Sequence, residues 1–309
     1  MGMTWADAHR LANIAAAKAH AQLGIDPGKL PIDVAEAIMA SGAILMWRPM
    51  PRLFGVYIND PGSSPGILVN SDLTPGARRF TAAHELGHHF LEHTTCTDEA
   101  DCPSTMPTGD DSIYSLRERR GWTPTEKMAE AFAAWFLMPR RAVSSALRVL
   151  ALDRPRDATD VYRLSLMLGV PHAAILRHLM NLRLATSDQV RRWSRESPGQ
   201  IKRRLDNNLG MPASRWPDVW TLTPAFDGRT ITVHDGDRLC VRVAAGYDVT
   251  APDWLPEVAA TAAGDGGPSM SSSATARSAE SVRSPCLMVR QIRGPGTPFS
   301  WMRPTHLSG

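Results

Sequence analysis

Residues 81–89 of the chain read Thr-Ala-Ala-His-Glu-Leu-Gly-His-His. They lie within residues 75–93, where apolar side chains recur with helical spacing, so we expect a helix there. Residues four apart share one helix face, and the imidazoles of His84 and His88 can therefore face a single ion. Neutral imidazoles suit Zn2+, and Glu85, about 100° round the helix, can reach a water without binding the metal. The sequence predicts a zinc site with Glu85 as general base.

A helix that merely carries surface histidines is the alternative to this interpretation. The chain has ten histidines among 309 residues, and roughly one or two such chains in a hundred would contain His-Glu-x-x-His by chance. His89 and His93 lie on other faces of the expected helix. They are interpreted as solvent-exposed residues or as supports for the metal ligands.

A catalytic zinc also needs a third protein ligand. The extended metzincin pattern is excluded, because Leu91 and Thr94 stand where it requires glycine and histidine. Downstream, Glu126 and Glu130 have the i, i+4 spacing of a metal ligand followed by an acid that orients a ligand histidine. Glu130 is also kept as an alternative ligand. Glu126 has a competing role, as the carboxylate of a capping box with Thr123.

Two separate motifs resemble the ImmA/IrrE family of zinc metallo-endopeptidases. The first is the helix of residues 80–93. The second is residues 126–139, Glu-Lys-Met-Ala-Glu-Ala-Phe-Ala-Ala-Trp-Phe-Leu-Met-Pro, which is similar to that family's helix ending in Leu-Met-Pro. The resemblance covers about residues 4–185 and implies a gluzincin-like peptidase that cleaves a helix-turn-helix repressor.

Carried over residue by residue, the resemblance implies that His84, His88 and Glu126 are the metal ligands and that Glu85 is the base. The chain departs from the family pattern in two places. Glu130 stands where Asn or Asp is more usual, and the loop between the two motifs is longer.

That loop, residues 94–122, contains Cys96 and Cys102. Two interpretations of these thiols stay open. They are inert or weakly paired, or one thiolate occupies the fourth position of the zinc and inhibits the resting enzyme.

The predicted fold is α+β, with a zincin-like peptidase domain, a helical C-terminal subdomain and a small β-rich, sandwich-like domain. The peptidase domain is expected at residues 1–212 and the β-rich domain at 213–309, with a flexible insertion at 261–284. Helices are predicted at 4–22, 31–41 (with Pro31 in its first turn), 75–93, 123–138, 140–152, 158–168 and 171–184. Strands are predicted at 43–47, 54–59, 66–70, 220–223, 230–234 and 238–244.

Within the first domain, residues 158–184 resemble a helix-turn-helix. Residues 164–174 read Leu-Ser-Leu-Met-Leu-Gly-Val-Pro-His-Ala-Ala and are followed by Arg177. A glycine turn between two apolar helices is also common in simple helix packing. The C-terminal region faintly resembles chagasin-like inhibitors, but their Asn-Pro-Thr-Thr-Gly loop is absent, so a sensing or docking module is expected.

Composition sets limits on the class of protein. Hydrophobic residues make up 43% and charged residues 21% of the chain, as in globular proteins. A net charge of +3 is too small to indicate nucleic-acid binding by itself. With no apolar run of about 18 residues, no signal-peptide pattern and no disulfide framework, a cytoplasmic protein with no membrane partner is expected.

The sequence therefore favours a regulated zinc endopeptidase. Its expected substrate is a helix-turn-helix transcriptional repressor, whose cleavage derepresses stress, mobile-element or defence genes. A nucleic acid or a small molecule is a candidate activator. The alternative is a non-catalytic regulator with structural zinc that binds DNA or the repressor through residues 160–205.

Overall fold

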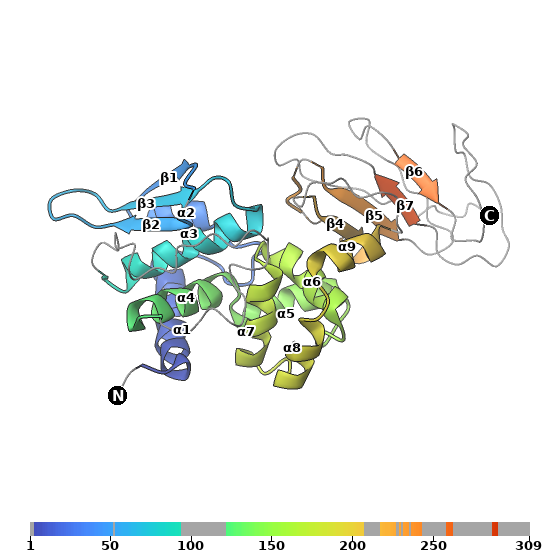
Figure 1. Cartoon of the computed structure of the whole chain (residues 1–309), viewed down its shortest axis with the longest axis horizontal. Helices are drawn as coiled ribbons and strands as arrows, with labels where there is room; N and C mark the ends of the chain where they lie inside the picture. The colour runs from blue at the N-terminus through green and yellow to red at the C-terminus, as the bar shows by residue number, and fades with distance from the viewer. Residues whose placement is uncertain are drawn as a thin grey trace. The chain divides into compact units, whose positions relative to one another are not determined.

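The computed structural model divides the chain into two compact units, residues 1–197 and 198–309 (Figure 1). The residues that it describes are 3–51, 53–93, 122–206, 217–226, 229, 231–234, 236–242, 258–261 and 286–289. The described part combines helices with two small sheets and is mostly helical. No helix within it is both long and apolar enough to cross a membrane.

The first unit contains a three-stranded sheet. Its strands are β1 (Ile44–Arg48), β2 (Gly55–Ile58) and β3 (Gly66–Asn70), in the order β1-β3-β2. β3 pairs in parallel with β1 and antiparallel with β2, so the expected turn between β2 and β3 is confirmed. The side chains of Ile67 and Val69 in β3 are fully buried. β2 is left at one edge.

Helix α3 (Pro75–Phe90) packs against β2 and β3, and α4 (Pro124–Leu137) packs against α3. Figure 1 shows the sheet, α3 and α4 as successive layers. A Cβ added to Gly87 of α3 would lie 3.0 Å from Cδ1 of Phe132 and 3.2 Å from Cα of Ala129. The absence of a side chain at Gly87 therefore allows α3 and α4 to approach closely. Helix α1 (Trp5–Gln22) covers α4 with a row of buried alanines, Ala8, Ala12, Ala16 and Ala19.

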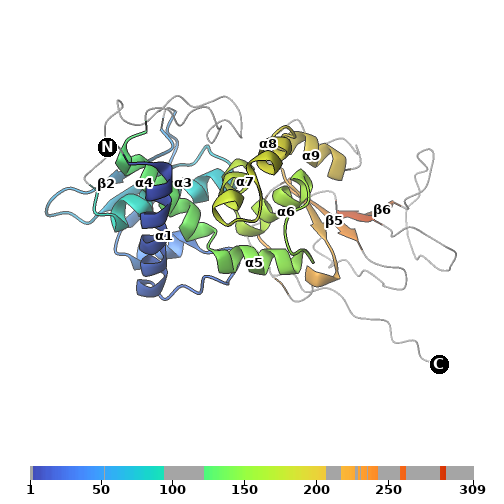
Figure 2. The same cartoon turned by 90° about the horizontal axis from the view of Figure 1, so that it is seen from below.

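The first unit continues with α5 (Arg140–Val149), α6 (Ala158–Leu168), α7 (His172–Asn181) and α8 (Ser187–Trp193). Figures 1 and 2 show α6, α7 and α8 grouped apart from the small sheet. Gly169 ends α6 with a φ of 63°, a left-handed conformation that glycine adopts without a steric penalty. Arg79 of α3 donates from Nε to the carbonyl of Gly169 at 3.0 Å and also contacts the carbonyl of Ile32. The bond to Gly169 holds the α6–α7 turn against α3, and the contact with Ile32 joins α3 to the segment before α2.

Three sequence expectations need correction. Helix α2 (Val34–Ala40) begins three residues after Pro31, because the carboxylate of Asp33 accepts from the N–H groups of Ala35 and Glu36 and caps the helix there. Residues 231–234 are not in a strand, since the N–H of His234 binds the carboxylate of Asp237 rather than a neighbouring strand. Helix α8 was not predicted, and it begins at a capping box formed by Thr186 and Gln189.

The second unit contains α9 (Pro198–Leu205), a 3-10 turn (Pro224–Phe226) and a four-stranded sheet. The strands are β4 (Val219–Leu222), β5 (Arg238–Arg242), β6 (Val258–Thr261) and β7 (Cys286–Val289), in the order β4-β5-β7-β6. Asp237 fixes the connection before β5, because its carboxylate accepts from the N–H groups of Asp218 and His234. Cys240 is disulfide-bonded, a pairing that its position in the sequence does not predict.

The strands predicted at 220–223 and 238–244 appear as β4 and β5, whereas the sandwich-like form and the flexible insertion are not tested. Its described residues form one sheet, and a sandwich would need a second. Of the predicted insertion at 261–284, only Thr261, the last residue of β6, lies within the described residues.

Because two histidines of α7 are buried, we expect acid to lower the free energy of unfolding. Burial lowers the pKa of His178 to about 3 and that of His172 to about 4, and Nε2 of His178 donates to the carbonyl of Met138 at 3.1 Å. Below the unfolded pKa of about 6.5, the unfolded chain binds protons that the folded chain excludes. This contribution is therefore present above about pH 6.5 and is lost as pH falls toward the folded values. Between pH 7 and 5 we expect each histidine to lower the free energy of unfolding by about 2 kcal/mol.

Urea unfolding at both pH values, with chelator present to remove metal-linked protons, checks this expectation. His178→Gln keeps an N–H donor for Met138 but cannot be protonated. Its pH dependence should be smaller than that of the parent by about 2 kcal/mol. An equal pH dependence in the two proteins would contradict the prediction.

Candidate metal centre

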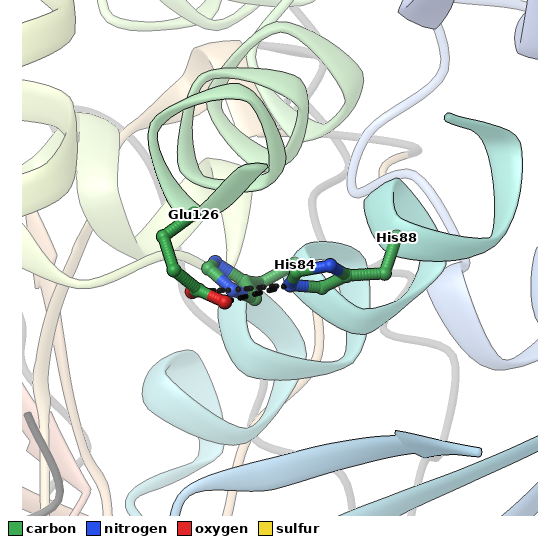
Figure 3. Close-up of side chains that lie close together, drawn as sticks. All are labelled: His84, His88 and Glu126. Atoms are coloured by element: carbon green, nitrogen blue, oxygen red, sulfur yellow. Dashed lines mark hydrogen bonds and ion pairs between the residues drawn. The ribbon is translucent and has the colours of Figure 1, made fainter. Parts of the chain in front are cut away.

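Helices α3 and α4 bring His84, His88 and Glu126 together, and Figure 3 shows their side chains converging on one point. Nε2 of His84 lies 3.0 Å from Oε2 of Glu126 and 3.1 Å from Nε2 of His88. Nε2 of His88 lies 3.5 Å from Oε1 of Glu126. One ligand atom from each residue fits within 4.8 Å of the others. The two motifs, 42 residues apart in sequence, thus form one site.

This donor set fits a zinc ion. Donor atoms bound at roughly 2.0–2.1 Å around a tetrahedral zinc lie about 3.3 Å apart. Nε2 of His84 lies 3.1 Å from Nε2 of His88 and 3.0 Å from Oε2 of Glu126, while the other carboxylate oxygen, Oε1, lies 3.5 Å from Nε2 of His88, so each separation is close to that value. Two imidazoles with one carboxylate are also a common donor set of catalytic zinc sites.

The charges around the site favour a cation. Burial by itself lowers the pKa of His84, but its contacts with the carboxylates of Glu126 and Glu130 outweigh burial and raise the pKa well above 6.5. Burial lowers the pKa of His88 to about 3, and the neighbouring His84 adds to this decrease. His88 is therefore neutral, the form in which an imidazole binds a metal, and the buried carboxylates of Glu126 and Glu130 lie beside the histidines.

The second ring nitrogen of His84 and that of His88 each face another side chain. Nδ1 of His88 lies 2.9 Å from Nδ1 of His93, and Nδ1 of His84 lies 3.7 Å from Oε2 of Glu130. The structure thus places His93 against His88. His89 instead lies 3.1 Å from the hydroxyl of Tyr57 on β2. Such contacts orient ligand histidines and leave the other nitrogen free for the metal.

Glu85 is buried between α3 and the edge strand β2. Burial raises the pKa of its carboxyl to about 7, an increase that the charge of His84 and a hydrogen bond from the N–H of Tyr57 oppose. A carboxyl group with a pKa near neutrality can both accept and return a proton at physiological pH. The position of Glu85 therefore suits a general base and acid.

The cap of α4 leaves the side chain of Glu126 at the site. The hydroxyl of Thr123 accepts from the N–H of Glu126 at 3.3 Å, which confirms the predicted start of the helix. The carboxylate of the same residue lies against His84. Thr123 thus fixes the helix terminus from which Glu126 reaches the histidines.

Some site expectations remain open, and others were missed. Cys96 and Cys102 lie outside the described residues, so their proposed inhibitory role stays a prediction. Sequence reasoning did not find Tyr57, whose N–H binds Glu85, or the contact of Arg177 with Glu130. The members of each pair, Tyr57 with Glu85 and Glu130 with Arg177, lie in different elements, so no helical or strand periodicity relates them.

A His-Glu-x-x-His helix beneath a small sheet, with a glutamate from a second helix, defines a metallopeptidase-type site. Residues 53–179 match the family model Peptidase_M78, the IrrE N-terminal-like domain. This match makes residues 53–179 similar to the ImmA/IrrE family of metallopeptidases. A comparison with curated proteins found no match.

Gly55→Ala is expected to displace the side chain of Glu85. A Cβ at this position in β2 would lie 2.6 Å from Oε1 of Glu85 and 2.7 Å from Cγ2 of Thr81. Since these separations are too short, the carboxylate must move, and a shift of about 1 Å can cost on the order of 100-fold in rate. We expect kcat to fall at least about tenfold while zinc content is unchanged.

Gly66→Ala is the matched control, because the added Cβ in β3 would meet only Cβ of Ile58, at 3.8 Å. Peptide hydrolysis and metal content should be measured for both variants. Equal kcat in the two variants would show that Gly55 does not set the position of Glu85.

Proposed function

We propose that this protein is a zinc endopeptidase that cleaves a helix-turn-helix transcriptional repressor and thereby derepresses stress, mobile-element or defence genes. The observation that carries the proposal is the convergence of His84, His88 and Glu126 beside the buried carboxyl of Glu85. In this proposal the first three residues hold the zinc and Glu85 moves the proton.

The mechanism assigns a task to each of these side chains. Zinc held by His84, His88 and Glu126 would supply Lewis acidity toward a substrate carbonyl and a water. Glu85 accepts a proton from the attacking water and then donates it to the leaving amine. The N–H of Tyr57 holds the carboxylate of Glu85 against β2 during both transfers.

The edge strand β2 is an argument for a polypeptide as the substrate. β2 is an edge strand of the three-stranded sheet, and β3 is the strand paired with it. A strand at a sheet edge can pair with an extended peptide through main-chain hydrogen bonds. Because Gly55 of β2 touches Glu85, a peptide paired there would lie beside the proposed base.

The regulatory alternative receives less support from the geometry. Seven of the ten residues of α7 are buried, including Arg177. A recognition helix must instead present a side-chain face to a DNA groove. The buried α7 argues against DNA binding by a helix-turn-helix at residues 158–184 and favours a packing role for this region.

Repressor cleavage also suggests where and how the enzyme acts. A repressor substrate places the reaction in the cytoplasm. A nucleic acid or a small molecule remains the candidate activator, and the C-terminal unit is proposed as a sensing or docking module. A thiolate of Cys96 or Cys102 in the open zinc position is the proposed inhibitory device.

The direct test uses the full-length protein with a small helix-turn-helix protein encoded beside its gene. We expect mass spectrometry to find a discrete cut in the repressor after zinc loading, no cut with chelator, and recovery when zinc is returned. Cleavage that persists in chelator would exclude zinc catalysis. An intact repressor with the zinc-loaded protein, with or without added nucleic acid, would contradict this substrate assignment.

A further inference from the structure

Arg177 lies in α7, the helix that follows the glycine turn of the helix-turn-helix-like segment. In a DNA-binding motif such an arginine would be exposed, yet only 7% of Arg177 is accessible. Its Nη2 lies 3.3 Å from Oε1 of Glu130 on α4. The guanidinium therefore faces the metal centre from within the helical subdomain.

The same carboxylate connects Arg177 to a proposed metal ligand. Oε2 of Glu130 lies 3.7 Å from Nδ1 of His84, while Nε2 of His84 faces Glu126 and His88. The two oxygens of a carboxylate have a fixed geometry, and a guanidinium presents its donors in a rigid fork. Holding Oε1 of Glu130 therefore sets the direction in which Oε2 points.

A buried carboxylate needs a partner. Glu130 is only 3% exposed, and burial of an unpaired charge is strongly unfavourable. Arg177 supplies a positive charge to this carboxylate, 3.3 Å from Oε1. Arg177 therefore keeps Glu130 on the Nδ1 side of His84, away from the open metal position.

We propose that Arg177 is a positioning residue of the zinc site and acts through Glu130 on His84. The inference rests on the proposed zinc site but not on the proposed substrate. A ligand histidine whose second nitrogen is held by a carboxylate is fixed in orientation and binds metal more strongly. The helical subdomain thus contributes a residue to the metal centre.

The test is a double-mutant cycle on the full-length protein. Zinc affinity is measured by competition with a chromophoric chelator, and the absorption spectrum of the Co2+-loaded protein reports ligand geometry. Arg177→Met should weaken zinc binding about 10–100-fold and alter the Co2+ spectrum. Arg177→Lys keeps the positive charge but not the planar donor geometry of the guanidinium, so its loss of zinc affinity should be smaller than that of Arg177→Met. In a Glu130→Gln background neither substitution should weaken zinc binding further, because the residue acts through Glu130.

Arg163→Met is the matched control. Arg163 pairs with Asp160 within α6, at 3.7 Å, so zinc affinity should stay at the parental value. Parental affinity and spectrum in Arg177→Met, or an equal loss in the Glu130→Gln background, would overturn the proposal. Should Arg177→Met fail to fold by circular dichroism, Arg177→Lys with and without Glu130→Gln completes the same cycle. A protein that binds zinc as expected but cleaves no repressor would contradict only the proposed substrate.

Discussion

Glu85→Gln is expected to lower peptide hydrolysis by about 10²–10⁴-fold while zinc binding is retained. The substitution preserves the size of the side chain but removes the group that accepts and returns the proton. Glu85 is absent from the set of converging ligand atoms, which comprises His84, His88 and Glu126. Zinc content and affinity should therefore remain close to those of the parent.

Single-turnover cleavage of the repressor, together with metal analysis of the same samples, checks this expectation. Glu36→Gln, at an exposed position in α2, controls for loss of one carboxylate. Parental activity in Glu85→Gln would remove Glu85 from the proton-transfer role. Loss of the metal from this variant would instead make Glu85 a ligand and change the assignment of the whole site.

Glu126→Ala is expected to have the second large effect, on metal binding. The substitution removes the carboxylate that lies 3.0 Å from Nε2 of His84 and 3.5 Å from Nε2 of His88. Only the two histidines would remain, so zinc affinity should fall by more than the roughly 100-fold that loss of a supporting partner can cost. Zinc stabilises the folded state by RT ln(1 + [Zn]/Kd), so at a zinc concentration below the Kd of the variant the rise in Tm on adding zinc should disappear.

Glu130→Gln distinguishes the ligand from its neighbour. If Glu126 is the third ligand, the Glu130 variant should lose no more than about 100-fold in zinc affinity and keep most of the zinc-dependent rise in Tm. Competition titrations and thermal unfolding with and without zinc measure both quantities. A larger loss from Glu130→Gln than from Glu126→Ala would reverse the assignment of the two residues.

These contrasts also show why the two glutamates are hard to separate from sequence. Both lie on one face of α4, four residues apart, and both are buried. Their different surroundings come from other parts of the chain: His84 and His88 for Glu126, and Arg177 for Glu130. Helical spacing identifies the pair but does not determine which of the two glutamates contacts both His84 and His88.

Local features were predictable because short-range rules produce them. The i, i+4 spacing of His84 and His88 places both on one helix face, and Thr123 begins α4 by accepting an N–H three residues ahead. The short apolar run at residues 66–70, predicted as a strand, appears as β3 with the same bounds. Each of these patterns depends on hydrogen bonds or periodicity within a few residues.

Tertiary packing decided the rest. Glu126 reaches His84 across 42 residues, Arg177 reaches Glu130 across 47, and Gly55 of β2 lies against Glu85. None of these contacts follows from spacing, because each depends on how far one element can approach another. The close approach of α3 and α4 at Gly87 brings the two separate motifs into one candidate metal centre. The sequence alone thus determined the residue types and the helices that present them, whereas the contacts between α3, α4, α7 and β2 decided which side chains share the site.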